Sequence, residues 1–217
     1  MTSFQSSALK RLAGVALALG MAHGAQALTV FNNGAPNQVS GVNMSSNVVA
    51  EDFTLLAATN ITNFRFWSIQ EFASSYTGTL QVTVYSDAGG TPGGVAVASA
   101  TSSPAATATG ASTAFGYAEY VFDIPAAATL GAGTYWLAIA NFPLNPISPS
   151  DMLWETTSGG LGSTAKYLQG ASWIDALEHL AFRVDGTLVG GGNVPEPSTL
   201  ALLAVALAGA AVMRRRV

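Results

Sequence analysis

Cysteine is absent from the 217 residues, which excludes disulfide bonds, thiolate nucleophiles and Cys-ligated metal sites. Histidine occurs only twice, and only His179 lies outside the N-terminal segment, so a zinc or iron site built from several histidines is not expected. The chain also lacks the G-x-S-x-G motif of serine hydrolases. These absences predict a protein with no cofactor and no catalytic residue. A glycoside hydrolase, which needs only two carboxylates, is the enzymatic alternative.

Basic residues are scarce in the middle of the chain. Between Leu28 and Pro197 there are three of them, Arg65, Lys166 and Arg183, against all twelve acidic residues, so the formal charge of this part is three minus twelve, or −9. Binding to nucleic acid requires positive charge. We therefore expect no nucleic-acid partner.

Long apolar runs are confined to the two ends of the chain. Residues 1–27 have the three parts of a secretory signal peptide: basic Lys10 and Arg11, an apolar core from Leu12 to Met21, and the small-residue sequence Ala25-Gln26-Ala27. This pattern predicts export through the translocon and cleavage by signal peptidase, so that the mature protein begins at Leu28. An N-terminal anchor is the weaker alternative, because an apolar core of about ten residues is too short to span a bilayer.

The C-terminal segment, residues 194–217, also has three parts in a fixed order. Pro195-Glu196-Pro197 is followed by an apolar run from Leu200 to Met213 and then by Arg214-Arg215-Arg216. Prolines keep the first block extended, the apolar run predicts a hydrophobic helix, and the arginines stay cytoplasmic under the positive-inside rule. A bilayer needs about 20 apolar residues, so this short span favours a tail that is held transiently over a permanent anchor.

This arrangement resembles the PEP-CTERM sorting tail of exported Gram-negative proteins. The resemblance implies recognition by exosortase, a membrane protease-transpeptidase, with Pro195, Glu196 and Pro197 as the sorting motif and Arg214, Arg215 and Arg216 as the basic end. It also implies transient anchoring in the inner membrane, then delivery to the cell surface or to an extracellular matrix that contains exopolysaccharide.

Residues 28–186 predict a single all-β domain, which a Gly-rich linker, residues 187–193, joins to the tail. Leu80, Val82 and Val84 alternate with polar residues as in a strand, and the Gly-rich sequence from Ser86 to Gly94 predicts a hairpin. Eight or more short strands favour a jelly-roll-like antiparallel β-sandwich over a closed barrel. The helices of the signal peptide and of the tail would flank this sandwich.

Three local predictions concern segments with weaker patterns. The Ala/Thr/Ser-rich segment Thr101–Thr113 is expected to be an exposed loop. A strand from Tyr117 to Ile124 is expected to end at Pro125, because proline cannot donate to a ladder. Residues Trp173–Leu180 have the one candidate helical turn. Short sequence stretches also resemble a β-rich domain that recurs among PEP-CTERM proteins; one of them is Gly133-Thr134-Tyr135-Trp136-Leu137. This resemblance bears on the fold but not on activity.

Two tryptophans and two aspartates are the candidate ligand residues. Trp67 and Trp136 alternate with the most apolar positions of their strands, so they could face solvent and stack on sugar rings; burial in the core is the alternative. Asp52 and Asp87 are weak candidates for calcium, since carboxylates suit Ca²⁺ but no calcium-loop motif is present. Turn formation is the alternative role of Asp87.

Together these features predict an exported, non-enzymatic protein of the cell envelope or extracellular matrix, sorted by its tail and associated with exopolysaccharide. A carbohydrate-binding module is the alternative. A polysaccharide hydrolase on the same β-sandwich has less support.

Overall fold

A computed structural model describes residues 27–145 and 151–190, and the compact unit within it extends from Ala27 to Val189. This unit has thirteen strands and one short 3₁₀ helix, η1 (Ala73–Ser75). The flanking helices expected from the sequence fall on residues outside the described ranges. Within those ranges, no helix has the length and hydropathy needed to cross a membrane.

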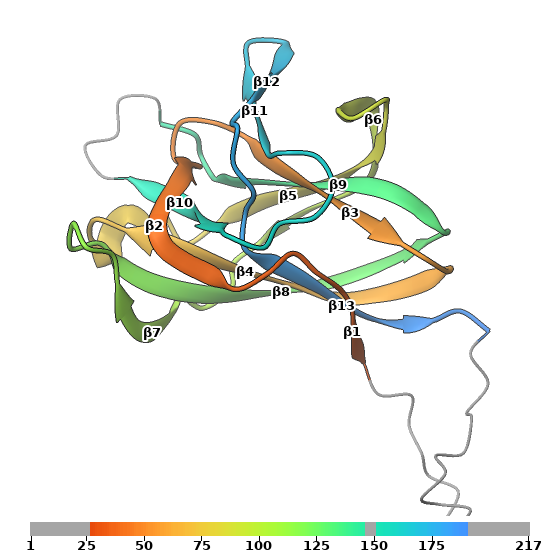
Figure 1. Ribbon diagram of the computed structural model, residues 1–217, viewed down its shortest axis with the longest axis horizontal. Coiled ribbons are helices and arrows are strands. Elements are labelled where there is room, and N and C mark those ends of the chain that lie inside the picture. The colour runs from red at the N-terminus through yellow and green to blue at the C-terminus, as the bar shows by residue number, and fades with distance from the viewer. Residues whose placement is uncertain (1–26, 146–150, 191–217) are drawn as a thin grey trace, which may run out of the picture. The chain divides into compact units, whose positions relative to one another are not determined.

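The strands form two antiparallel sheets (Figure 1). The first sheet has the order β1-β13-β4-β10-β2, and β8 pairs with both β4 and β7. Its strands are β1 (Leu28–Asn32), β2 (Pro36–Asn43), β4 (Thr59–Gln70), β7 (Thr107–Ser112), β8 (Ala118–Leu130), β10 (Met152–Thr157) and β13 (Phe182–Leu188). The second sheet has the order β12-β11-β3-β9-β5-β6. Its strands are β3 (Val49–Leu55), β5 (Leu80–Asp87), β6 (Pro92–Ser102), β9 (Gly133–Asn141), β11 (Lys166–Gln169) and β12 (Ser172–Asp175).

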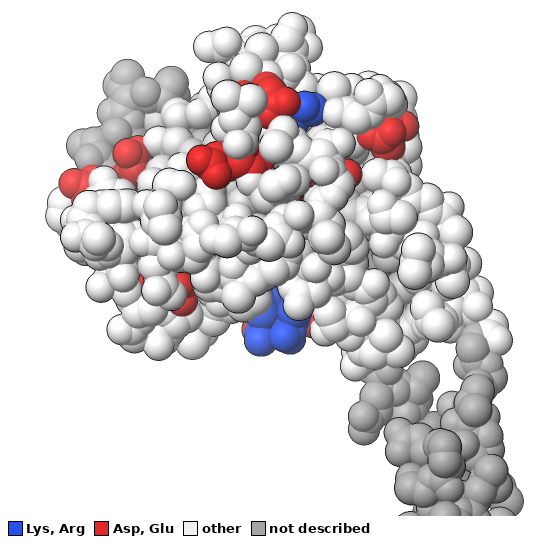
Figure 2. All heavy atoms as spheres, in the orientation of Figure 1, with Lys and Arg blue, Asp and Glu red and all other residues white. Residues whose placement is uncertain are grey.

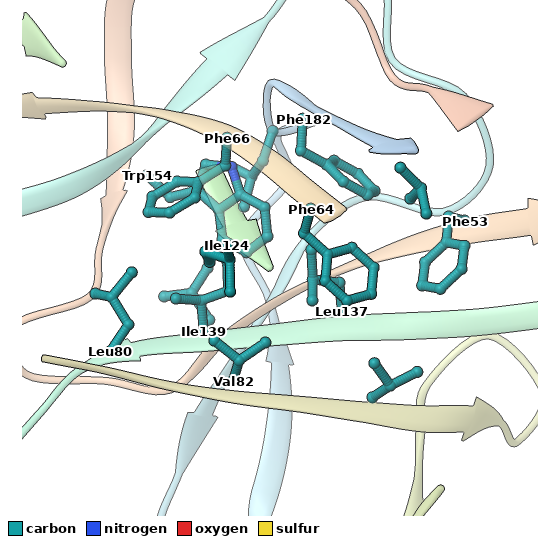
Figure 3. Close-up of a cluster of buried hydrophobic side chains, with 14 of the residues drawn as sticks. Phe53, Phe64, Phe66, Leu80, Val82, Ile124, Leu137, Ile139, Trp154 and Phe182 are labelled. Atoms are coloured by element: carbon teal, nitrogen blue, oxygen red, sulfur yellow. The ribbon is translucent and has the colours of Figure 1, made fainter. Parts of the chain in front are cut away.

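One hydrophobic core lies between the two sheets, as in a β-sandwich (Figure 3). Phe66 of β4 stacks on Phe122 of β8, with ring centroids 5.0 Å apart, and meets Trp154 of β10 edge to face at 5.5 Å. The second sheet contributes Phe53 and Leu137, which are also fully buried in this core. Because both sheets supply side chains to a single core, the predicted antiparallel sandwich is confirmed at the level of two facing sheets.

The central strand, β4, explains an irregularity in the sequence. Ile61 and Phe64 are both buried although they are three residues apart, whereas a regular strand alternates with a period of two. Ile61 and Asn63 pair with Gly186 and Asp185, which are adjacent in β13, so Thr62 is an extra residue in β4 at this point. Beyond the bulge, Asn63, Arg65 and Trp67 alternate with the buried residues Phe64 and Phe66 and lie on the outer face of the sheet.

The predicted end of a strand at Pro125 is wrong. β8 continues through Pro125 to Leu130, and Pro125 pairs with Asn63 at the point where the pairing of β8 with β4 shifts register. A proline fits inside a sheet at such a bulge, because the ladder hydrogen bond that it cannot donate is not required there. The proline therefore coincides with the bulge and does not end the strand.

Two weaker predictions are also wrong. Part of the expected loop Thr101–Thr113 is strand β7, whose small, mostly exposed residues pair with β8. The expected helical turn after Trp173 is instead strand β12, which pairs with β11 as a short hairpin. In both segments cross-strand hydrogen bonds, which a local pattern does not reveal, decide the conformation.

The outer face of the second sheet has a small apolar cluster of its own. Trp136, Ala50 and Ala138 are buried there, and the hairpin of β11 and β12 contributes Trp173 to the packing. The ring of Trp173 also meets that of Tyr85 at 6.0 Å. This hairpin, seen above the sheets in Figure 1, therefore covers residues that alternation alone would place in solvent.

Candidate functional site

The candidate ligand surface lies on the outer face of the first sheet and is here called the Trp67 face. It consists of Asn63, Arg65 and Trp67 of β4, Asp123 of β8 and Arg183 of β13. Arg65 and Arg183 are direct cross-strand partners, and Arg65 also pairs with Asp123. Two of the three basic residues of the exported part thus lie side by side. The blue patch over β4 and β13 in Figure 2 shows this concentration.

Hydrogen bonds hold the polar side chains of the Trp67 face in place. Arg65 donates from Nε to Oδ1 of Asp123 at 2.7 Å, and its Nη2 forms an ion pair with Oδ2 of the same carboxylate. Asn63 donates to Oδ1 of Asp123 at 3.0 Å. The Arg65 hydrogen bond, followed by that from Asn63, holds the pKa of Asp123 below its usual value despite some burial. The carboxylate is therefore charged at neutral pH and fixes the guanidinium.

Trp67 is the aromatic part of this face. It is half-buried, it follows Arg65 by two residues on the same side of β4, and its cross-strand neighbour is Val121. A half-exposed indole beside guanidinium and amide donors offers an apolar surface for a sugar ring and hydrogen-bond donors for hydroxyl or carboxylate groups. The structure thus leaves Trp67 available for the predicted sugar contact.

Trp136 does not fit the same prediction. Its side chain is fully buried, its Nε1 donates to Oδ1 of Asp87 at 2.8 Å, and the ammonium of Lys166 lies 5.8 Å from its ring centroid. A sugar cannot reach a ring in this position. Alternation correctly placed Trp136 on the outer face of its sheet but could not show the hairpin that covers it.

The two calcium candidates are used by the fold itself. Asp52 is 5% exposed and accepts from the Ser163 N–H at 3.1 Å, while burial raises its pKa and favours its neutral form. Asp87 accepts from the N–H groups of Gly89 and Gly90 in the turn after β5, as well as from Trp136. No group of three or more potential metal-ligating side chains occurs in residues 27–145 and 151–190. Turn and packing roles thus account for both aspartates.

A pair of buried carboxyl groups was not predicted. Glu119 of β8 and Glu155 of β10 are 4% and 0% exposed, and both are bridged by Gln38 of β2. The Gln38 N–H donates to Oε1 of Glu155 at 2.6 Å, and its side-chain amide donates to Oε2 of Glu119 at 3.2 Å. Burial, with a further contribution from the charge on Glu119, raises the pKa of Glu155 to about 8. Glu155 is therefore mainly protonated at neutral pH and ties edge strand β2 to the sheet.

A further buried carboxyl group, Glu51, lies in the other sheet. Glu51 of β3 is fully buried, accepts from the Leu180 N–H at 3.0 Å and from Asn33 Nδ2 at 3.2 Å, and has its Oε1 3.1 Å from His179 Nδ1. Burial raises the pKa of Glu51 to about 9, although the bond from Leu180 acts in the opposite direction. Glu51 therefore joins three segments of the chain as a neutral group.

The Gly-rich loop after β10 closes over this cluster. The Leu161 N–H donates to Oδ1 of Asn33 at 2.7 Å, and a Cβ placed on Gly160 would lie 2.1 Å from His179 Cβ. Only glycine leaves room for the imidazole at that distance. No local signal could have found this cluster, because His179 and Glu51 are 128 positions apart in sequence.

The sorting residues predicted at the two ends lie mostly outside the described residues. Pro195, Glu196, Pro197, Arg214, Arg215, Arg216 and Ala25 are among those outside. Leu28, the predicted first residue of the mature protein, is the first residue of β1. Cleavage after Ala27 would therefore leave that strand whole.

Comparison with known proteins gives one finding. No curated protein matches the sequence. The model of the PEP-CTERM protein-sorting motif matches residues 193–216, which include every residue assigned above to the motif and to the basic end. This motif implies export and processing of the C-terminal signal by exosortase, a membrane protease. The chain thus carries a PEP-CTERM sorting signal at the end of an all-β domain.

Proposed function

We propose that this chain is a non-enzymatic protein of the cell envelope or extracellular matrix, and that its Trp67 face associates with exopolysaccharide once exosortase has processed the tail. The sorting motif at residues 193–216 is the observation that carries the first part. The half-exposed indole beside two arginines supports the second part. Arg65 and Arg183 each pair with a carboxylate of the same face, Asp123 and Asp185. An arginine has five N–H donors, so the N–H groups that these ion pairs leave free would favour a polysaccharide that offers hydroxyl or carboxylate acceptors.

The positions of the perturbed carboxyl groups support a binding role over hydrolysis. A glycoside hydrolase needs two carboxyl groups that reach the glycosidic bond from opposite sides. Glu51 and Glu155 are 0% exposed and Glu119 is 4% exposed, so a polysaccharide chain has no access to any of them in this structure. The carboxylate of the Trp67 face, Asp123, is occupied by Arg65.

Replacing Pro195, Glu196 and Pro197 by alanine is expected to leave export intact and to block maturation. Exosortase would no longer recognise the extended block, so the protein would keep its tail and stay in the inner-membrane fraction. Fractionation with mass mapping of the C-terminus measures this. Replacing Gly190, Gly191 and Gly192 by serine is the matched control and should mature normally. An unchanged mature C-terminus in the alanine variant would contradict sorting through this motif.

Trp67→Ala is expected to weaken binding to purified exopolysaccharide by about tenfold, which corresponds to about 1.4 kcal/mol. The reason is that the variant removes the stacking surface but no core contact. Co-sedimentation with the polysaccharide, before and after chemical reduction of its carboxylates, measures the loss. Trp173→Ala removes another half-buried indole from the opposite side of the sandwich and should bind as the unmodified protein does. Equal binding by all three proteins would refute the assignment of the Trp67 face.

A further inference from the structure

The second sheet ends at β6 in an open edge. In the described residues β6 pairs with β5 alone, and its regular part runs from Ala98 to Ser102, opposite Val84 to Leu80. Every second residue of such a strand directs its N–H and C=O away from the sheet, so the edge offers a template for another strand. Val95 and Val97, just before this part, are 79% and 47% exposed.

The usual protection of an edge strand is missing from the regular part of β6, Ala98 to Ser102. Natural edges are kept from pairing by charged residues, proline, bulges or short length. The residues from Ala88 to Ala118 contain no charged side chain, and the prolines nearest the regular part are Pro92 and Pro104. The two register shifts in the pairing of β5 with β6 lie on either side of Tyr85, before the regular part begins. Ala98 to Ser102 therefore presents an unguarded row of small, uncharged residues.

The other described edges have protection that the regular part of β6 lacks. The part of β8 that β7 does not reach, for example, contains Asp123 and Pro125. β1 has five residues and a register shift, and β12 has four residues and ends at charged Asp175. β2 begins at Pro36 and contains Gln38 with a φ of 58°, and β7 contains Gly110 with a φ of 86°. A left-handed residue in a strand distorts the row of hydrogen-bonding groups. The contrast singles out the regular part of β6, where five consecutive residues, Ala98 to Ser102, have no charge, proline, bulge or left-handed residue.

Charge decides which occupant fits this edge. The exported part has a formal charge of −9, so two copies repel each other at most orientations. The β6 edge is a place where they can meet without bringing acidic side chains together. Antiparallel pairing of β6 with itself, with the two-fold axis at Ala100, also sets Ser99 of each copy opposite Thr101 of the other, and such pairs are favourable. A strand of a different protein would need its own uncharged sequence, with serine or threonine at the opposing positions, to pair equally well.

We propose that β6 is a self-association edge, at which two copies of this chain pair antiparallel and join their second sheets into one continuous sheet. The contact is isologous, so it closes at a dimer and does not propagate into a fibre. Pairing of one strand buries less than a standard interface, so the dimer should be weak, forming at about 0.1–1 mM. This inference does not depend on saccharide binding or on the sorting tail.

A single-cysteine scan tests the register directly, since the chain has no cysteine of its own. Ser99→Cys, Ala100→Cys and Thr101→Cys are made in a protein of residues 27–190, which contains both sheets and their common core. A disulfide forms where two Cβ atoms come within about 4.5 Å, so the position nearest the two-fold axis should cross-link several times faster than the other two. Leu56→Cys and Leu177→Cys, at residues that are 94% and 80% exposed, are controls and should cross-link slowly.

A charge variant gives the second measurement. Ser99→Lys with Thr101→Lys should abolish the concentration-dependent dimer in sedimentation equilibrium, because lysine is the residue that natural edges use against pairing. Leu56→Lys with Leu177→Lys adds the same charge elsewhere and should leave the dimer unchanged. Circular dichroism melts confirm that both variants fold. A protein that stays monomeric up to about 1 mM, or five cysteine variants that cross-link equally, would overturn the proposal, including in the case where a different protein occupies the edge.

Discussion

Raising the pH from about 5 to about 9 is expected to destabilise the domain by several kcal/mol, because two buried carboxyl groups must then lose their protons. The pKa of Glu51 is raised from 4.5 to about 9 and that of Glu155 from 4.5 to about 8, in both cases mainly by burial. Between the unfolded and folded pKa values, the folded state binds more protons than the unfolded state does. Stability from these groups is therefore fully present below about pH 4.5 and falls as the pH rises through this window, by up to about 1.4 kcal/mol per pH unit for each group.

Glu51→Gln should reduce the fall of the unfolding free energy with rising pH. The amide has nearly the shape of the protonated carboxyl group: its oxygen can accept from Leu180 N–H, and its NH₂ can donate to His179 Nδ1. The variant has no proton to lose, so at pH 8 it should be more stable than the unmodified protein by about 2–4 kcal/mol, and at pH 5 the two should be similar. Urea unfolding at pH 5, 7 and 9 measures the difference.

The controls for this result separate burial from charge. Glu178→Gln removes a carboxylate that is exposed and close in sequence to His179, and its stability should follow the pH as the unmodified protein's does. Glu155→Gln should flatten the dependence up to about pH 8. Parallel curves for Glu51→Gln and the unmodified protein would show that Glu51 is ionised in the folded state at neutral pH.

Sequence patterns predicted those parts of the fold that depend on alternation. Leu80, Val82 and Val84 all lie in the core, and the turn of the expected hairpin, residues 88–91, connects β5 to β6 within Ser86–Gly94. Patterns failed at Pro125, because the bulge that accommodates this proline belongs to the pairing of β8 with β4. A property of two strands cannot be seen in one of them.

The buried carboxyl groups show the same limit for the candidate site. Glu51 looks like an ordinary strand residue beside Asp52, and its partners Asn33, His179 and Leu180 are 18 to 129 positions away. Only the folded topology brings them together. The sorting tail could be predicted because its three parts are contiguous and are recognised in the order in which they occur in the sequence.

Substitution of Trp136 should lower the stability of the domain, whereas substitution of Trp67 should lower saccharide binding. The reason is that Trp136 is fully buried and Trp67 is only partly buried. Trp136→Ala is expected to cost about 3–5 kcal/mol of unfolding free energy, the usual range for a buried aromatic that is truncated. It removes a fully buried ring from the cluster with Ala50 and Ala138 and withdraws the hydrogen bond that Asp87 accepts. Trp67→Ala should cost about 1 kcal/mol or less, as is usual for positions that retain solvent contact.

Trp136→Phe separates the loss of ring packing from the loss of the hydrogen bond to Asp87. The phenyl ring still fills most of the space under the β11–β12 hairpin, but it has no N–H for Asp87, so the expected cost is about 1–2 kcal/mol. Urea unfolding measures the loss of unfolding free energy in each variant, and co-sedimentation of the same proteins with the polysaccharide measures binding. Trp136→Phe should be less stable yet bind normally, while Trp67→Ala should be nearly as stable as the unmodified protein yet bind poorly. If Trp136→Phe instead lost saccharide binding while it remained folded, the hairpin would have to open in solution and expose Trp136, and both tryptophans would then be ligand residues.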